Sequence, residues 1–207
     1  MTAIIDYGVG NLFSLTCSFR RIGADVTVTS DEQVIRSADR IVLPGVGAFS
    51  DAAAKLRLSG LDKVLCEQAA KGVPILGICL GMQLLFERSF EYGEHEGLGL
   101  IKGDIVPFAG KIADNLQIPH IGWNSLKFDG NNPLYKYIKS GDFVYFVHSY
   151  FAPAEVESAA TLTEYGIEFA SSVACGNIFG CQFHPEKSGD VGLNILRAFC
   201  EIGGAVC

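Results

Sequence analysis

A cysteine stands between two glycines where an apolar run gives way to a helical pattern. Cys79 lies in the segment 77–81, Gly-Ile-Cys-Leu-Gly, after the apolar residues 73–76 and before the helical pattern 82–86. A strand-to-helix corner of this kind exposes its central side chain, and glycines flank it because a Cβ would collide there. The N-terminus of the next helix favours a thiolate over a thiol. The pattern therefore predicts a nucleophilic cysteine, although a buried cysteine between two glycines would give the same letters.

A nucleophilic cysteine needs a base, and the base needs a group that orients it. His184 closes the apolar strand 178–183 and precedes Pro185, which disfavours the α region for the residue before it. We therefore expect His184 to be extended, with Glu186 two residues on projecting from the same face. Glu186 would hold one imidazole nitrogen while the other faces the thiol. Cys79, His184 and Glu186 form a candidate catalytic triad.

A second glycine-rich corner, Pro-Gly-Val-Gly at 44–47, follows the apolar strand 40–43. Its backbone N–H groups are free of side-chain obstruction and could face a ligand, although an ordinary turn has the same composition. The predicted oxyanion donors are the N–H of Leu80, directly after the nucleophile, and one from Val46 and Gly47. Both corners follow parallel strands, at whose carboxyl ends open α/β sheets bind ligands.

The elements that must position these residues form an α/β pattern in the first half of the chain. Short apolar strands alternate with helical patterns, one of which begins with a capping box at Ser30 and Gln33. Strands separated by helices imply a parallel sheet with right-handed crossovers. The charged segment 87–97 is interpreted as a loop, and the β-type alternation beyond it predicts mostly antiparallel strands before a last helix. With no linker in the sequence, we expect one domain over residues 1–207.

Composition argues against several classes of function. Lys and Arg total 16 against 23 acids, with a net charge of −7 and no basic run, so nucleic acid is not an expected partner. No signal peptide and no apolar run of about 18 residues are present, which predicts a cytoplasmic protein with no membrane partner. The seven cysteines are irregularly spaced with no C-x-x-C pair, so neither a disulfide framework nor a metal site is expected. The six besides Cys79 are most simply small buried hydrophobes. The glycine-rich loop 6–11 does not match the dinucleotide fingerprint, and no cofactor is expected.

Three motifs, in this order and spacing, resemble the class I (triad type) glutamine amidotransferases: Pro-Gly-Val-Gly at 44–47, Gly-Ile-Cys-Leu-Gly-Met-Gln at 77–83 and His-Pro-Glu at 184–186. The resemblance covers nearly the whole chain. Further stretches at 6–12, 119–124, 145–150 and 187–188 are similar to the glutaminase subunits of imidazole glycerol phosphate synthases, with Ile121 a conservative departure from methionine. The family implies an α/β, three-layer fold: a mainly parallel central sheet flanked by helices, with added antiparallel strands in the second half.

The resemblance also implies a reaction. Cys79 attacks the side-chain amide of glutamine, and the ammonia passes to the cyclase subunit of imidazole glycerol phosphate synthase. That partner converts a phosphoribulosyl aminoimidazole-carboxamide ribonucleotide (PRFAR) into imidazole glycerol phosphate and an aminoimidazole-carboxamide ribotide (AICAR) in histidine biosynthesis. By the same resemblance, six residues bind glutamine: Gly47, Gln83, Glu91, His148, Ser149 and Tyr150. Four face the cyclase subunit: Asn11, Trp123, Tyr145 and Lys187.

These assignments have alternatives. Glu91 could be merely solvated in its charged loop, and Trp123, the only tryptophan, could be a core residue. A paralogue could supply ammonia to another synthase, for example in a surface-sugar pathway or in pyridoxal phosphate synthesis. A cysteine hydrolase of peptides or esters would act without a partner and without preference for glutamine. A catalytically silent regulatory subunit is disfavoured by the intact triad.

The chain offers no second domain to accept ammonia, so we expect a heterodimer. Basal glutaminase activity should be low and should rise when the partner binds its nucleotide substrate, through the donor geometry at 44–47.

Overall fold

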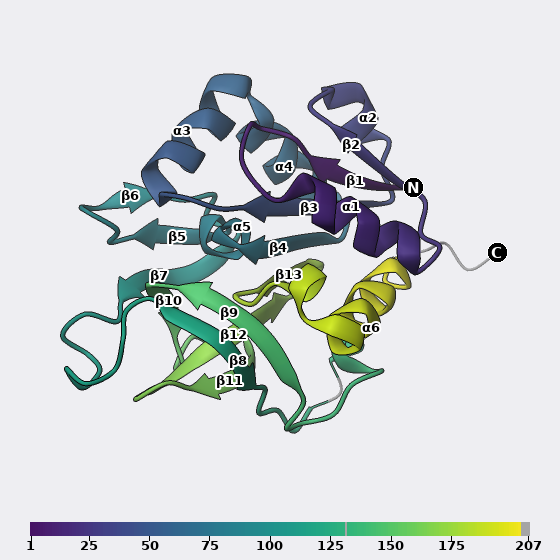
Figure 1. Cartoon of the computed structure of the whole chain (residues 1–207). Coiled ribbons are helices and arrows are strands. Elements are labelled where there is room, and N and C mark those ends of the chain that lie inside the picture. Colours follow the sequence, from purple (N-terminus) through teal and green to yellow (C-terminus); the bar gives the residue numbers. More distant parts are fainter. Residues whose placement is uncertain (131, 204–207) are drawn as a thin grey trace.

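A parallel sheet forms the first half of the fold, as predicted (Figure 1). In the computed structural model, which describes residues 1–130 and 132–203, four strands lie side by side in the order β2 (Val26–Thr29), β1 (Thr2–Ile5), β3 (Arg40–Gly45) and β4 (Ile75–Cys79). A fifth, β13 (Ile178–Cys181), comes from the far end of the chain and continues the sheet beside β4, also in parallel. The segments that follow residues 45, 79 and 181 therefore emerge next to one another.

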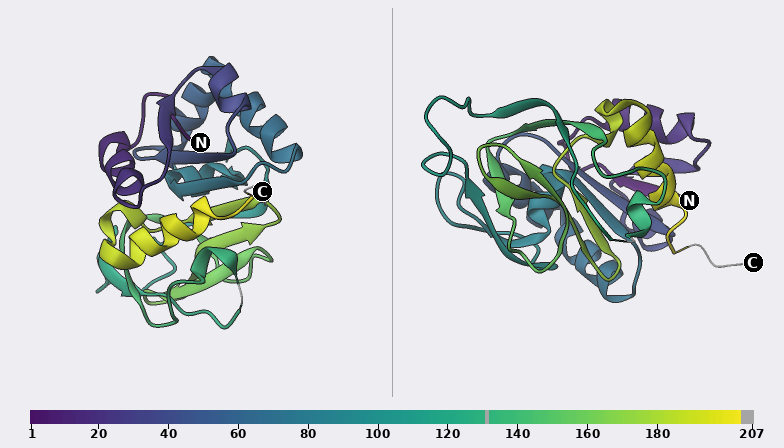
Figure 2. Two further views of the ribbon diagram at one scale, coloured as in Figure 1. Left: turned by 90° about the vertical axis from the view of Figure 1, so that its right-hand side faces the viewer. Right: turned by 90° about the horizontal axis from the view of Figure 1, so that it is seen from below.

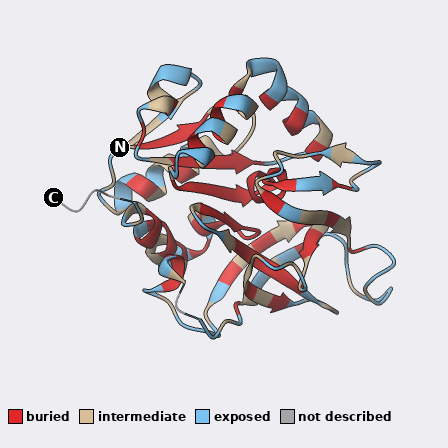
Figure 3. Cartoon of the chain, turned by 180° about the vertical axis from the view of Figure 1, so that it is seen from behind, coloured by how far each residue is buried: buried red, intermediate tan, exposed pale blue. Residues whose placement is uncertain are grey.

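Helices cover both faces of this sheet and give the predicted three layers (Figures 1 and 2). One face carries α2 (Glu32–Arg36), α3 (Phe49–Ser59) and α4 (Leu61–Ala70), and the other carries α1 (Leu12–Arg21) and α6 (Gly189–Cys200). Successive strand residues point to opposite faces, so each face has its own core. Ile41 and Leu43 pack in the core that includes α3, whereas Val42 between them packs in the core of α1 and α6. Figure 3 shows these buried strands in red.

Mostly antiparallel strands extend the sheet beyond β13, again as predicted. Among the described strands of this part, only β5 and β7 pair in parallel. The strands follow β13 in the order β12 (Glu168–Cys175), β10 (Tyr150–Pro153), β7 (Ile101–Pro107), β5 (Phe86–Ser89) and β6 (His95–Glu96), with β11 (Ala159–Glu164) paired to β12.

A separate two-stranded ribbon, β8 (His120–Ser125) with β9 (Phe143–His148), packs against the core of α1 and α6. Two short 3-10 helices, η1 (Pro133–Tyr135) and η2 (Pro185–Lys187), complete the described elements. No helix in residues 1–130 and 132–203 is long and apolar enough to cross a membrane.

Several local predictions were wrong. The helix after Cys79, α5 (Leu80–Leu84), is shorter than expected, because Phe86 is already paired with Ile101 in the sheet and its side chain is fully buried. The segment 87–97 is a hairpin of β5 and β6 and not a loop. Arg88 in this segment binds Asp104 on β7 at 2.9 Å. Its charge, which suggested a solvent-exposed loop, instead links strands β5 and β7.

Two smaller predictions also failed. The N-cap of α2 is Asp31, whose carboxylate accepts the N–H of Gln33 at 2.8 Å, and not Ser30. Cys17 and Cys175 are exposed and Cys66 and Cys200 are half-buried, so of the described cysteines besides Cys79 only Cys181 is a fully buried hydrophobe. Cys207 lies outside the described residues.

Candidate active site

The corner at Cys79 brings three backbones into direct contact. Cys79 has φ 55°, a left-handed conformation that is strained for any residue with a side chain. A Cβ on Gly77 would lie 2.6 Å from the carbonyl oxygen of Gly81, and one on Gly45 would lie 2.6 Å from the nitrogen of Gly81. A Cβ on Gly81 itself would lie 1.9 Å from the carbonyl oxygen of Leu43. The glycines therefore allow β3, β4 and α5 to meet at the nucleophile, as the sequence predicted.

His184 and Glu186 are bound to each other beside this corner. His184 Nδ1 lies 2.8 Å from Glu186 Oε1, and each side chain is only 3% exposed. The backbone of His184 is held on both sides, since its N–H donates to the carbonyl of Tyr145 at 2.9 Å and its carbonyl accepts the hydroxyl of Ser188 at 2.6 Å. The second ring nitrogen, Nε2, is buried with no hydrogen-bond partner among the described residues. This nitrogen can therefore exchange a proton with a reacting group.

The local geometry of this pair differs from the prediction. His184 is extended as expected, with φ −101° and ψ 97°, but Glu186 lies in the 3-10 helix η2. Glu186 reaches the imidazole because the chain turns back after Pro185, and not because an extended strand places the two side chains on one face.

Charge supports a thiolate–imidazolium pair. Burial alone would lower the pKa of His184, but Cys79 and Glu186 outweigh burial and raise the pKa to about 10. A protonated imidazole beside the sulfur favours the nucleophilic thiolate. Cys181, by contrast, is fully buried, and burial followed by the charge of Glu186 raises the pKa of its thiol well above the ordinary value. Cys79 is thus the better nucleophile of the two.

A pocket of about 270 Å³ lies at this corner, slightly below the range of about 300–1,000 Å³ for small-molecule sites. Pro119 and Val147, which were not predicted, complete its wall. The structure brings into this one pocket two predicted catalytic residues, all three predicted oxyanion residues and all the predicted glutamine-binding residues: Cys79, His184, Val46, Gly47, Leu80, Gln83, Glu91, His148, Ser149 and Tyr150.

Glu91 is neither free nor simply solvated. Its carboxylate accepts the backbone N–H of Phe49, the first residue of α3, whose N-cap Ala48 has no side-chain acceptor. The partial positive charge of the helix N-terminus stabilises a carboxylate at this position. Glu91 therefore places a fixed negative charge on the pocket wall.

His148 belongs to a directed chain of hydrogen bonds. Its Nδ1 lies 2.9 Å from the carbonyl of Tyr150, which can only accept, so Nδ1 carries the hydrogen. Nε2 then accepts from Nδ1 of His120 at 3.0 Å. Burial lowers the pKa of His120 to about 4 and that of His148 to about 3, so both rings are neutral at neutral pH. His148 is therefore poorly placed to act as a general base, and that role falls to His184.

Gln182 is a residue that sequence reasoning missed. It is fully buried, and its Nε2 lies 3.8 Å from the sulfur of Cys79. A signal was available, because Gln182 precedes His184 by two residues and alternation on an extended chain places both on one face.

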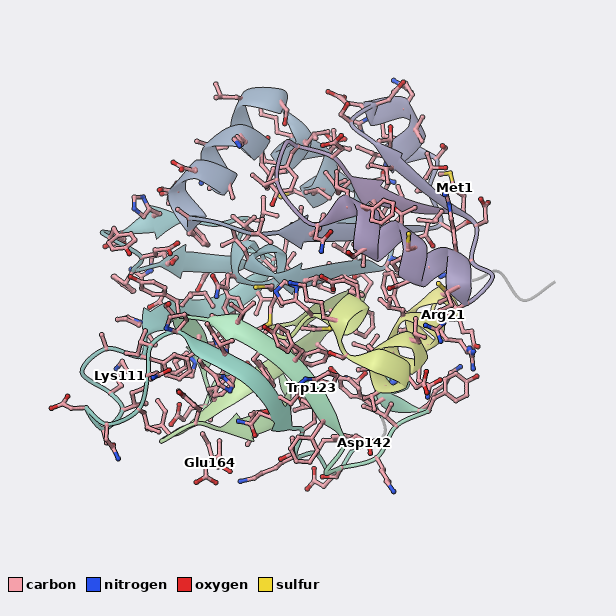
Figure 4. All side chains as sticks on the ribbon, viewed as in Figure 1. Met1, Arg21, Lys111, Trp123, Asp142 and Glu164 are labelled. Carbon is pink, nitrogen blue, oxygen red and sulfur yellow. The ribbon has the colours of Figure 1, made fainter. Side chains whose placement is uncertain are left out.

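Three of the four predicted interface residues lie together: Trp123 and Tyr145 on the ribbon, and Lys187 of η2 beside them. Trp123 is 55% exposed, which excludes a core role, and it packs edge-on against Tyr145 with 6.1 Å between ring centroids. Lys187 Nζ lies 5.7 Å from the centroid of the Tyr145 ring. Asn11 instead caps α1, where its side chain accepts the N–H of Ser14 at 3.3 Å. Figure 4 marks Trp123 on the ribbon.

Residues 1–130 and 132–203 contain no group of three or more His, Cys, Asp or Glu side chains that could hold a metal ion. The described pocket offers the thiol of Cys79 and the imidazole of His184.

Known proteins are similar to this chain in both sequence and fold. The family model described as glutamine amidotransferase class-I matches residues 3–202. A protein of Caldanaerobacter subterraneus named imidazole glycerol phosphate synthase subunit HisH is 48% identical over 203 residues, 98% of each chain. A protein of the same name from Lactococcus lactis is 46% identical over 199 residues, 96% of each chain. A solved structure of a glutamine amidotransferase has a TM-score of 0.73 at 16% identity, over 95% of this chain and 98% of the other. The chain therefore belongs to the class I glutamine amidotransferase family.

Proposed function

We propose that this chain is the glutaminase subunit of an imidazole glycerol phosphate synthase, folded as one glutaminase domain over residues 1–207. The observation that carries the proposal is the pocket that joins Cys79 to the bound pair His184 and Glu186. The relatives named as a subunit of that synthase align over nearly their whole length, which supports the choice of enzyme.

The reaction has two halves. The thiolate of Cys79 attacks the side-chain amide carbon of glutamine, and a tetrahedral intermediate forms with a negative oxygen. His184 Nε2–H protonates the amide nitrogen, the C–N bond breaks, ammonia leaves and a glutamyl thioester remains. His184 then takes a proton from water, which attacks the thioester. The C–S bond breaks, glutamate leaves and the thiolate returns. Glu186 keeps the imidazole oriented throughout.

The negative oxygen of the intermediate needs hydrogen-bond donors. The N–H of Leu80 and one from Val46 and Gly47 are the groups proposed to supply them, and losing one such donor typically costs about 100- to 1,000-fold in rate. Gly47 has φ 93°, a conformation that suits glycine, and Val46 is 42% exposed. An exposed segment of this kind, next to the ribbon, is where a partner can complete the donor geometry.

The groups proposed to hold glutamine are one carboxylate and several neutral polar groups. The carboxylate of Glu91 uses one oxygen on the N–H of Phe49, so its other oxygen can accept from the α-ammonium of the substrate. The segment His148 to Tyr150 and Gln83 also line the pocket and are proposed to contact glutamine.

The proposed partner is the cyclase subunit, which receives the ammonia and converts PRFAR into imidazole glycerol phosphate and AICAR. The exposed ribbon face with Trp123, Tyr145 and Lys187 is proposed as part of the contact, and Asn11 as a further part at the start of α1. An aromatic patch with a cation is typical of a contact that carries binding energy. We place the enzyme in the cytoplasm, where thiols are kept reduced, because the mechanism needs a free Cys79.

Glutamine hydrolysis by the full chain tests the proposal in three states: alone, with the matching cyclase subunit, and with that subunit and PRFAR. We expect low activity alone and a rise in the third state. Equal activity in all three states would contradict the partner dependence, and turnover by Cys79→Ala in the third state would contradict the nucleophile. Hydrolysis of peptides or esters by the chain alone would favour a partner-independent hydrolase.

A further inference from the structure

Gln182 contacts the nucleophile, although the mechanism above does not use it. Its side chain is fully buried, and a buried amide is normally hydrogen-bonded at both ends. Its Oε1 accepts from Nε2 of Gln83 at 3.0 Å. Its Nε2 lies 3.8 Å from Cys79 Sγ, within the range for a donor to sulfur. One end of the amide therefore faces another side chain, and the other end faces the reacting atom.

A backbone carbonyl determines which way this amide points. The carbonyl of Tyr150 accepts from Nε2 of Gln83 at 3.0 Å and has no hydrogen to donate. Turning the Gln83 amide over would place two oxygens against each other. Turning Gln182 alone would place two NH₂ groups against each other. Only one arrangement satisfies every contact, and it directs the NH₂ group of Gln182 at the sulfur.

An N–H group directed at sulfur favours the thiolate, because a charged acceptor makes the stronger hydrogen bond. The carbonyl of Val147, 3.9 Å from the same sulfur, has the opposite effect, since it can accept from the thiol but not stabilise the thiolate. Gln182, which directly follows β13, supplies a donor to the sulfur and so counteracts the effect of the Val147 carbonyl.

We propose that Gln182 is a further catalytic residue, whose side-chain amide donates a hydrogen bond to the sulfur of Cys79. It acts twice: it stabilises the thiolate before attack, and it stabilises the thiolate again when the C–S bond of the thioester breaks and the electron pair returns to sulfur. Gln83 and the Tyr150 carbonyl hold the amide in the required orientation. This inference rests on the proposed function and deepens the description of the same site.

The test removes the donor and keeps the size of the side chain. In the full chain, Gln182→Met is compared with Gln68→Met, a buried glutamine on α4 that is 1% exposed and donates to the carbonyl of Arg36 at 3.1 Å. The rate of alkylation of Cys79 by iodoacetamide at pH 7 is followed by mass spectrometry of the peptide that contains it, so that the other cysteines do not interfere. Urea unfolding of both variants reports the general cost of losing a buried amide.

We expect Gln182→Met to slow alkylation of Cys79 by about tenfold, since a hydrogen bond to a charged group is worth about that much. Glutamine turnover in the complex with the cyclase subunit should fall with it, whereas Gln68→Met should alter neither rate. A folded Gln182→Met variant that is alkylated at the unaltered rate would overturn the proposal. Alkylation does not depend on glutamine hydrolysis, so a failure of the proposed function leaves this readout intact.

A second measurement needs no substitution at position 182. In ¹⁵N-labelled full chain, the side-chain amide signals of Gln182 should move when Cys79 is alkylated or replaced in Cys79→Ser, because the acceptor changes. Signals that stay in place in both samples would overturn the proposal even if Gln182→Met did not fold.

Discussion

Gly81→Ala tests whether the close approach of three backbones positions the nucleophile. A Cβ at position 81 would lie 1.9 Å from the carbonyl oxygen of Leu43 and 2.8 Å from its carbonyl carbon. Both atoms belong to the backbone of β3, so no side-chain rotation can relieve the contact. Since carbon contacts are favourable only from about 3.5 Å outward, β3 and α5 would have to separate by more than about 1 Å.

That separation reaches the reaction as well as the core. Val46 and Gly47 follow β3, and Leu80 begins α5, so the proposed oxyanion donors would move apart. A misplacement of about 1 Å can cost about 100-fold in rate. Overpacking of a tight contact costs about 1–3 kcal/mol. We expect Gly81→Ala to lower kcat for glutamine by about 100-fold and the free energy of unfolding by about 3 kcal/mol.

Gly72→Ala is the control for a glycine substitution that meets no other atom. Unlike Gly81, Gly72 has a positive φ, 83°, and no atom lies within 4 Å of a Cβ built there. This substitution should cost about 1 kcal/mol of backbone strain and leave kcat unaltered. Glutaminase turnover is measured in the complex with the cyclase subunit and PRFAR, and stability by urea unfolding of the chain. An unaltered kcat for a folded Gly81→Ala variant would refute the reasoning.

Three further predictions concern the triad, the buried histidines and the ribbon. Glu186→Gln removes a charge that helps to raise the pKa of His184, so we expect kcat to fall by about 100-fold or more. The alkaline limb of the pH–rate profile should also shift to lower pH, because His184 would lose its proton at a lower pH. His120 and His148 have lowered pKa values in the folded chain, so the unfolded chain binds these protons first as the pH falls. From pH 6.5 to 5 the free energy of unfolding should drop by up to about 1.4 kcal/mol per histidine per pH unit, and the raised pKa of His184 opposes this drop only near pH 6.5; a flat profile in urea unfolding would contradict this. Trp123→Ala should weaken binding to the cyclase subunit by about 30-fold in calorimetry without lowering the stability of the chain, because the side chain is 55% exposed.

The parts of the site that could be predicted from the sequence are those whose function imposes a backbone constraint. The glycines around Cys79 stand where backbones pass so close that an added Cβ would lie under 3 Å from them, and only glycine fits at such positions. The parallel pairing of the first strands followed in the same way, since apolar strands that alternate with helices favour a parallel sheet with right-handed crossovers.

The features that failed depend on contacts distant in sequence. The charges of the segment 87–97 suggested solvent, but Arg88 is paired with Asp104 on β7, 16 residues further on. The segment itself folds back as a hairpin in which Ser89 pairs with His95. The end of the helix after Cys79 was misplaced for the same reason, because the pairing of Phe86 with Ile101 competes with another helical turn. Neither partner is visible within a window of local periodicity.

Glu186 shows that a spacing of two residues admits more than one geometry. An extended chain and a 3-10 turn can both bring residue i+2 to residue i, and Pro185 is compatible with either, since it favours an extended residue before it and also suits the first position of a helix. The contact of His184 with Glu186 was therefore predicted correctly from the wrong local structure. On the other side of His184 the chain bends at residues 182 and 183, directly after β13 ends at Cys181, and there too a spacing of two residues brings side chains to the same sulfur. Applied one step upstream, this spacing leads to Gln182, whose amide lies 3.8 Å from the sulfur that the triad activates.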